Sequence, residues 1–194
     1  MSDRRTFLLG ATAAALLPAP AFARAAIRRL FDGRTLAGWT PLGDANWRVE
    51  HGLITADRGG ISFLVSRERY RDFDLRAEFW VSENANSGIF LRCQDRAAIT
   101  ADNAYEVNIF DRRPDPTYGT GAIVNVAPVA LPLPHAGGRW NVMVIRMLGD
   151  RFSVVLNGRT TVREARDGRH AEGPVALQYG AGIVRFRRVT LRPI

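Results

Sequence analysis

The sequence predicts an all-β protein, either a sandwich or a barrel. Nine segments show the period-two alternation of apolar and polar residues that is typical of strands, and no window shows a convincing helical period. Short turn motifs join several of these segments, and many short strands at spacings of about 8–12 residues favour a sandwich or a barrel. The predicted strands are 47–50, 53–56, 73–81, 88–94, 104–110, 140–147, 151–157, 174–179 and 184–191.

Three turns and two long loops separate these strands along the chain. His51-Gly52 joins the first two strands, and Gly149-Asp150 joins 140–147 to 151–157. Asn157-Gly158 is the strongest hairpin motif, because both residues tolerate the positive φ that a type I′ turn requires. The irregular stretches 111–121 and 127–138 are long for loops of a compact domain, and loops of that length often carry function.

The first 23 residues have the layout of a twin-arginine export signal. Arg4-Arg5 precede an apolar run from Phe7 to Leu17, and small residues and prolines follow as far as Ala23. A membrane anchor is the alternative, but a span needs roughly 20 apolar residues and this run is shorter. We therefore expect cleavage after Ala23, export of a folded protein to the periplasm or beyond, no membrane association afterwards, and a single domain over residues 24–194.

The charge distribution and the cysteine content limit the kinds of partner and bond that we expect for this chain. The net charge is +8 and all 27 basic residues are arginine, but the arginines are scattered and form no basic stripe with interleaved aromatics. We therefore expect no nucleic-acid partner. Cys93 is the only cysteine, so an internal disulfide is not possible, and its shared parity with Ile89 and Leu91 predicts a buried side chain.

Strand parity places an unusual set of side chains away from the core. Alternate residues of a strand point to opposite faces, and in 73–81 the apolar residues Leu75, Ala77, Phe79 and Val81 form the core set. In four predicted strands, 73–81, 88–94, 104–110 and 174–179, the face opposite the core set carries long polar side chains mixed with aromatics. If these four strands are neighbours, that face suits a carbohydrate. An ordinary solvated sheet face is the alternative. The side chains concerned are Glu78, Trp80, Phe90, Arg92, Glu106, Asn108 and Gln178.

Six motifs, in order over roughly residues 28–194, give the chain a family resemblance. Asn86-Ser87-Gly88-Ile89-Phe90-Leu91-Arg92 matches Asn-Ser-Gly-(Ile/Val)-x-x-Arg, and Tyr105 to Asp111 resembles Tyr-Glu-x-Gln-(Ile/Leu)-x-Asp with Asn108 in place of Gln. The chain thereby resembles the 3-keto-disaccharide hydrolase family, although Tyr179-Gly180 stands where that family often has His-Gly. The other similar segments are 30–39, 47–54, 70–79 and 120–122, and shorter segments at 138–141, 157–158 and 173–178 complete the resemblance.

The resemblance implies both a fold and an activity. The implied fold is a concanavalin A-like β-sandwich, a jelly roll of two antiparallel sheets, with the site on the concave sheet. The implied activity is cleavage of glycosides whose sugar carries a ketone at C3, with a carbohydrate as the partner and no cofactor.

Such a ketone acidifies the proton on C2, so the reaction needs one base and one cation or donor near the ketone oxygen. We predict Glu106 as the base and Arg92 as the charge stabiliser, side by side on the concave sheet. Two alternatives stay open: a structural ion pair between Arg92 and Glu106, and direct hydrolysis by Glu78 paired with Glu106. The predicted substrate-binding residues are Glu78, Trp80, Asn86, Phe90, Asn108, Asp111, Gln178 and Tyr179.

Other functional classes have weaker support. The three histidines lack ligand spacing, which predicts no metal centre, with calcium held by Asp111 near the Asp102 and Asp115 loops as a minor alternative. A non-catalytic, exported carbohydrate-binding module is the main alternative function. A scaffold or adhesion protein is a third possibility and would need an exposed apolar patch.

Overall fold

The computed structural model describes residues 26–194, which form thirteen strands in two sheets and a 3-10 turn at Pro116–Tyr118. The eight-stranded sheet contains, in order, β11 (Arg159–Arg166), β10 (Arg151–Leu156), β9 (Trp140–Leu148), β6 (Phe73–Val81), β13 (Val184–Pro193), β4 (Leu53–Ala56) and β3 (Arg48–Glu50), with β1 (Arg28–Arg29) paired to β13. The five-stranded sheet contains β2 (Trp39–Leu42), β5 (Ser62–Ser66), β12 (Ala176–Ala181), β7 (Asn86–Leu91) and β8 (Tyr105–Ile109).

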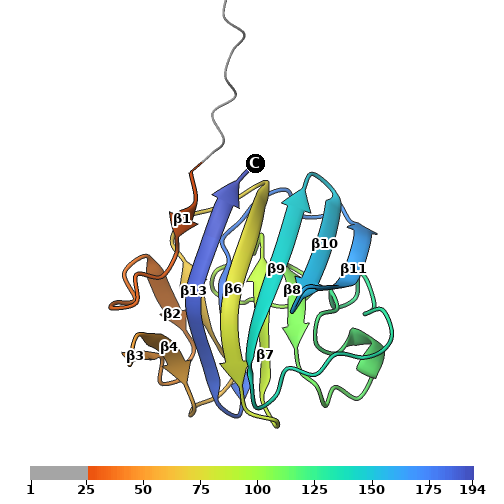
Figure 1. The fold of residues 1–194 in the computed structure, drawn as a ribbon. Coiled ribbons are helices and arrows are strands. Elements are labelled where there is room, and N and C mark those ends of the chain that lie inside the picture. The colour runs from red at the N-terminus through yellow and green to blue at the C-terminus, as the bar shows by residue number, and fades with distance from the viewer. Residues whose placement is uncertain (1–25) are drawn as a thin grey trace, which may run out of the picture.

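Every strand pair is antiparallel, which makes the molecule a concanavalin A-like sandwich and confirms the predicted fold class. Figure 1 shows the larger sheet in front, with β13, β6, β9, β10 and β11 side by side, and β7 and β8 behind it. The predicted export signal lies outside the described residues and stays a prediction. Within residues 26–194, no helix has the length and apolar character that crossing a membrane requires.

The three predicted turns are confirmed by the backbone. His51-Gly52 and Asn157-Gly158 have positive φ at both residues, at 50° and 76° and at 52° and 82°, and Gly149 has φ 57°. The Asn157 side chain also links this turn to β9, because Oδ1 accepts a hydrogen bond of 2.8 Å from the Val142 amide. These residues therefore set the register of β9, β10 and β11 locally.

All nine predicted strands are present, and four observed strands were not predicted. β1 has only two residues, and β2, Trp39-Thr40-Pro41-Leu42, shows no alternation of apolar and polar residues. β5 is Ser-Phe-Leu-Val-Ser, an apolar run between two serines, so it shows no alternation of apolar and polar residues. β11 pairs with β10 through two register shifts, and such irregularities disturb the alternation on which the prediction depends.

The main core lies between the sheets. Leu75, Ala77, Phe79 and Val81 of β6 are all buried there, which confirms the parity assigned to this strand. A second cluster lies on the outer face of the five-stranded sheet. It contains Phe63, Val65, Phe90, Cys93, Ile99, Ala104 and Ala176.

Cys93 is buried as predicted, but it belongs to the second cluster and does not share the core with Ile89 and Leu91. The reason is Arg92, whose φ of 52° ends β7 at Leu91 and breaks the alternation. Burial raises the pKa of the Cys93 thiol to about 12, so the thiol is protonated near neutral pH.

Candidate functional site

Glu106 lies in the middle of β8 with 8% of its surface exposed. Among residues 26–194, no side chain or amide donates a hydrogen bond to its carboxylate, and no cation lies within ion-pair distance. Desolvation raises the pKa of this carboxyl from 4.5 to about 7, and the positive charge of Arg113 opposes that rise. A carboxyl with a pKa near neutrality can give or take a proton under physiological conditions.

Two amide side chains share the outer face of the five-stranded sheet with Glu106. The register pairs Glu106 with Phe90, and it pairs Gly88 with both Asn108 and Gln178, so all of these side chains leave the sheet on the same side. Asn108 Nδ2 donates a hydrogen bond of 2.7 Å to the Tyr118 carbonyl. Asn108 Oδ1 and Gln178 Oε1 are buried and have no hydrogen-bond partner among the described residues.

Gly88 lies directly against the Glu106 and Gln178 side chains. A Cβ atom at this position would lie 3.2 Å from both Gln178 Oε1 and Glu106 Oε1. Real Cβ contacts are rarely that close, so even a methyl group would press on both oxygens. The Asn-Ser-Gly motif therefore supplies, through its glycine, the clearance beside the candidate base.

Aromatic and backbone groups surround the site. Phe90 packs edge-on against Phe63, with ring centroids 5.1 Å apart. Beyond β8, the backbone of residues 121–124 continues the sheet, since the Val124 amide donates to the Glu106 carbonyl at 2.9 Å. Phe90 thus lies on the predicted face but is 2% exposed, which makes it a buried wall rather than an open stacking surface.

Arg92 is not beside Glu106, and this expectation was wrong. Its side chain is 1% exposed and donates to the carbonyls of Arg71 and Gly149, each at 2.8 Å, and to that of His170 at 3.0 Å. Its ion-pair partner is Asp72, at 3.1 Å.

The predicted structural ion pair between Arg92 and Glu106 is wrong for the same reason. The positive φ at Arg92 turns its side chain out of the strand alternation, so parity could not place it. Burial lowers the pKa of this guanidinium, an effect that the Asp72 carboxylate opposes.

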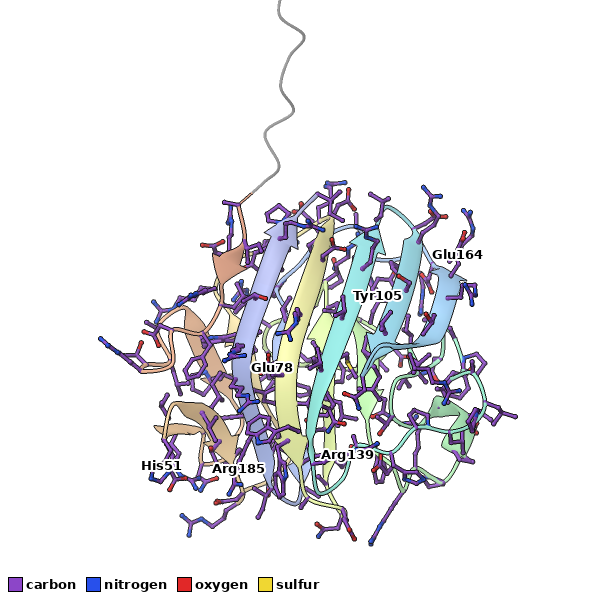
Figure 2. All side chains as sticks on the ribbon, in the orientation of Figure 1. His51, Glu78, Tyr105, Arg139, Glu164 and Arg185 are labelled. Carbon is purple, nitrogen blue, oxygen red and sulfur yellow. The ribbon has the colours of Figure 1, made fainter. Side chains whose placement is uncertain are left out.

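Glu78 and Trp80 were expected near Glu106 and are not, because β6 belongs to the other sheet. Figure 2 shows Glu78 on the eight-stranded sheet in the foreground. The Glu78 carboxylate accepts hydrogen bonds from Arg76 at 2.7 Å and from Arg187 at 2.8 Å. The Trp80 ring packs against the Arg185 guanidinium, whose Cζ lies 4.9 Å from the ring centroid. Pairing of Glu78 with Glu106 for direct hydrolysis is therefore excluded by topology.

Two further predicted residues, Tyr179 and Asp111, have contacts of their own within the fold. Tyr179 is 4% exposed and packs in the main core, so its predicted contact with substrate was wrong. Asp111 accepts hydrogen bonds from the Thr120 hydroxyl at 2.6 Å and from the amides of Ala136 and Gly137, each at 2.9 Å. Its carboxylate holds two loops together.

Asn86 begins β7 and is half-buried beside Gly180. Within the part of the chain that the structure describes, no three acidic, histidine or cysteine side chains converge as a metal site would require.

Arg113 is the residue that sequence reasoning missed. It lies in the loop 111–121, which was expected to be functional because of its length, and its charge acts on Glu106. No strand parity applies to a loop residue, so only its place in that loop could have indicated it.

Comparisons with known proteins agree with this architecture. The family model described as 3-keto-alpha-glucoside-1,2-lyase-like domain matches residues 26–192. A 3-keto-disaccharide hydrolase from Bacteroides thetaiotaomicron is 25% identical over 142 residues, and the match covers 58% of this chain and 49% of that protein. The chain thus spans about half the length of this curated relative.

Two solved structures have the same fold. One is a protein from Parabacteroides distasonis assigned by name to the glycosyl hydrolases, with TM-score 0.77, 17% identity, and coverage of 87% of this chain and 94% of that one. The other is the carbohydrate-binding module CBM66 from Bacillus subtilis, with TM-score 0.62 and 20% identity. The match covers 80% of this chain and 95% of that module.

Proposed function

Because the chain belongs to the 3-keto-alpha-glucoside-1,2-lyase-like domain family, we propose that it cleaves 3-keto-glycosides, with Glu106 as the base. The observation that carries this proposal is the environment of Glu106. Among the described residues, the buried Glu106 carboxyl forms no hydrogen bond and no ion pair, and its pKa is raised to about 7. Two buried amide oxygens without hydrogen-bond partners lie on the same face. Buried polar atoms without partners are rare in folded proteins and need an explanation, and the donors of a bound ligand would supply one here.

The unpartnered atoms at this site define the chemistry of the ligand. Asn108 Oδ1 and Gln178 Oε1 are acceptors, so the ligand must bring donors. Sugar hydroxyls are such donors, and the apolar wall of Phe90 and Phe63 suits the C–H face of a sugar ring.

The reaction then proceeds by elimination. The Glu106 carboxylate takes the proton from C2, and the electrons of that C–H bond form an enediolate whose negative charge rests on the C3 oxygen. When the ketone re-forms, the C1–O bond breaks, a C1–C2 double bond appears, and the departing oxygen takes a proton from Glu106. Addition of water across that double bond gives the free 3-keto sugar.

Arg113 takes the role first predicted for Arg92. Its positive charge opposes the rise in the pKa of Glu106, and we propose that the same charge stabilises the developing negative charge on the C3 oxygen. Arg92 cannot do this, since its guanidinium donors are directed to buried carbonyls and to Asp72.

The decisive experiment compares two glutamate variants on a disaccharide oxidised at C3 and on the parent disaccharide. Glu106→Gln should lower the cleavage rate by roughly 10²–10⁴-fold, the usual contribution of a positioned base. Its exchange of the C2 proton in D₂O, followed by NMR, should fall in parallel. The matched control is Glu78→Gln, which removes a buried carboxylate from the other sheet and should keep the rate near that of the wild type.

A folded Glu106→Gln variant that cleaves at the wild-type rate would exclude Glu106 as the base. A wild-type protein that binds oligosaccharides but cleaves neither substrate would instead be a non-catalytic carbohydrate-binding module.

A further inference from the structure

A cavity lies on the outer face of the eight-stranded sheet. Its volume is about 470 Å³, and it is bounded by the segment from β1 to Gly33, by the turn at His51 and by β6 and β13. Figure 2 shows His51 and Glu78 on this side of the molecule. The cavity belongs to the sheet that does not carry Glu106, so it is separate from the proposed site of cleavage.

Four arginines line this cavity, namely Arg29, Arg76, Arg187 and Arg188. Three of them approach the Glu78 carboxylate, at 2.7 Å for Arg76, 2.8 Å for Arg187 and 3.4 Å for Arg188. Glu78 is only 6% exposed, whereas the three arginine side chains are 44%, 40% and 72% exposed. One buried carboxylate thus holds three guanidinium groups whose remaining donors stay available on the outside.

An irregularity in β13 brings two of these arginines to the same face. Consecutive residues of a regular strand point to opposite faces, yet Arg187 and Arg188 both approach Glu78. The pairing of β13 with β6 shifts register between Arg187 and Thr190, and Arg188 has φ 50°. A positive φ costs free energy in a residue other than glycine, and bulges often redirect side chains toward a site.

The charges of the lining are not balanced. Arg29 forms no ion pair among residues 26–194. Asp32 also lines the cavity, but its carboxylate accepts hydrogen bonds from the Arg34 and Thr35 amides, each at 2.7 Å, and from the Thr35 hydroxyl at 2.8 Å. These hydrogen bonds lower the pKa of Asp32 and keep it ionised as part of its own turn. Four guanidinium groups therefore face two carboxylates that already have partners.

We propose that this cavity binds a small ligand through a carboxylate or phosphate group, held between Arg29 and Arg188. The planar guanidinium group matches the geometry of both oxyanions and binds them in bidentate fashion. The volume is in the range of small-molecule sites and admits an anionic sugar as well as a free ion. This binding goes beyond the cleavage of neutral 3-keto-glycosides and does not depend on it.

The test is calorimetric titration of the folded protein with inorganic phosphate, glucose 6-phosphate, glucuronate and neutral glucose. We expect saturable binding of the anions and none of glucose. A higher affinity for the sugar-bearing anions than for phosphate identifies an anionic sugar as the ligand, and equal affinities identify the free ion. The absence of saturable anion binding would overturn the proposal.

Two variants and a matched control locate the binding. Arg29→Gln and Arg188→Gln should each weaken anion binding by about tenfold or more, the loss expected for one charge-assisted hydrogen bond. Arg29 has no protein carboxylate to lose, so its variant tests the site even if Arg188→Gln perturbs the bulge. Arg163→Gln removes an exposed arginine of β11 outside the cavity and should leave the affinity unchanged. Equal weakening by all three variants would mean diffuse surface attraction and would overturn the proposal.

Discussion

At the scale of single residues, the fold places the Glu106 carboxyl where its ionised form is unfavourable. Glu106 is buried without a partner, and burial penalises its ionised form. The other buried glutamate, Glu78, shows the opposite behaviour. Although burial acts to raise its pKa, hydrogen bonds from Arg76 and Arg187 lower that pKa below its ordinary value. The same residue type thus has a raised pKa on one sheet and a lowered pKa on the other.

The raised pKa of Glu106 predicts a pH-dependent cost in stability. Its folded pKa of about 7 exceeds the ordinary 4.5, so the folded state binds more protons between these values and loses stability as pH rises through them. The loss is about 3 kcal/mol and is complete above pH 7. Glu106→Gln should therefore match the wild type near pH 4 and be more stable by up to about 3 kcal/mol at pH 8.

Urea unfolding of both proteins across this pH range measures the difference. Other titrating groups cancel because they are common to the two proteins. A stability difference that is constant with pH would show that Glu106 ionises in the folded state as it does in the unfolded chain.

At the scale of elements, the turn of a hairpin determines how its two strands pair. The hairpin of β10 and β11 depends on Asn157 and Gly158, both with positive φ. A Cβ at Gly158 would meet no atom within 4 Å, so the requirement for glycine there comes from the backbone alone.

Gly158→Ala should accordingly lower the free energy of unfolding by about 1 kcal/mol, the cost of the left-handed conformation for a residue with a Cβ. Gly168→Ala is the control, because Gly168 does not have a positive φ and its added Cβ would lie 3.9 Å from the nearest atom. That variant should be neutral or slightly stabilising. Thermal or urea unfolding checks both, and equal effects of the two variants would contradict the role of the turn.

At the scale of the whole molecule, Arg92 ties the sheets together at one end of the sandwich. It follows β7 of the five-stranded sheet, and its guanidinium binds backbone and carboxylate oxygens in the residues before β6 and in the turn between β9 and β10 of the other sheet. It also binds the His170 carbonyl in the loop before β12. One buried cation thereby satisfies three carbonyl groups that would otherwise lack donors.

Lysine cannot reproduce this geometry, because it carries a single ammonium group instead of a planar fork. Arg92→Lys should lower the free energy of unfolding by about 3 kcal/mol, as expected when a buried hydrogen-bonded ion pair loses its geometry. The backbone strain at position 92 is the same for both residues and does not contribute.

Arg146→Lys is the control for this substitution, since Arg146 pairs with Asp74 at the surface with 52% of its side chain exposed. Its effect should stay below about 1 kcal/mol. Urea unfolding measures both variants, and an effect of Arg92→Lys as small as that of the control would exclude the proposed linkage of the two sheets.

The sequence by itself determined the local features of this protein. Period-two alternation predicted β6, β9 and β13 because each has one face in the core and one face outside it. Asn157-Gly158 predicted its hairpin because the conformation depends only on those two residues. Glu106, Asn108 and Gln178 were predicted to share a face with Phe90, and the register of β8, β7 and β12 confirms this.

Tertiary structure alone decided which strands are neighbours. β6 and β7 are consecutive in the chain, yet they lie in different sheets, and this separates Glu78 and Trp80 from Glu106. Alternation reports the two faces of a strand but not the sheet to which it belongs, since sheet membership is set by hydrogen bonds between distant segments. Arg92 was misplaced for a related reason: its positive φ, stabilised by carbonyls from three distant loops, ended the alternation that a local pattern assumes.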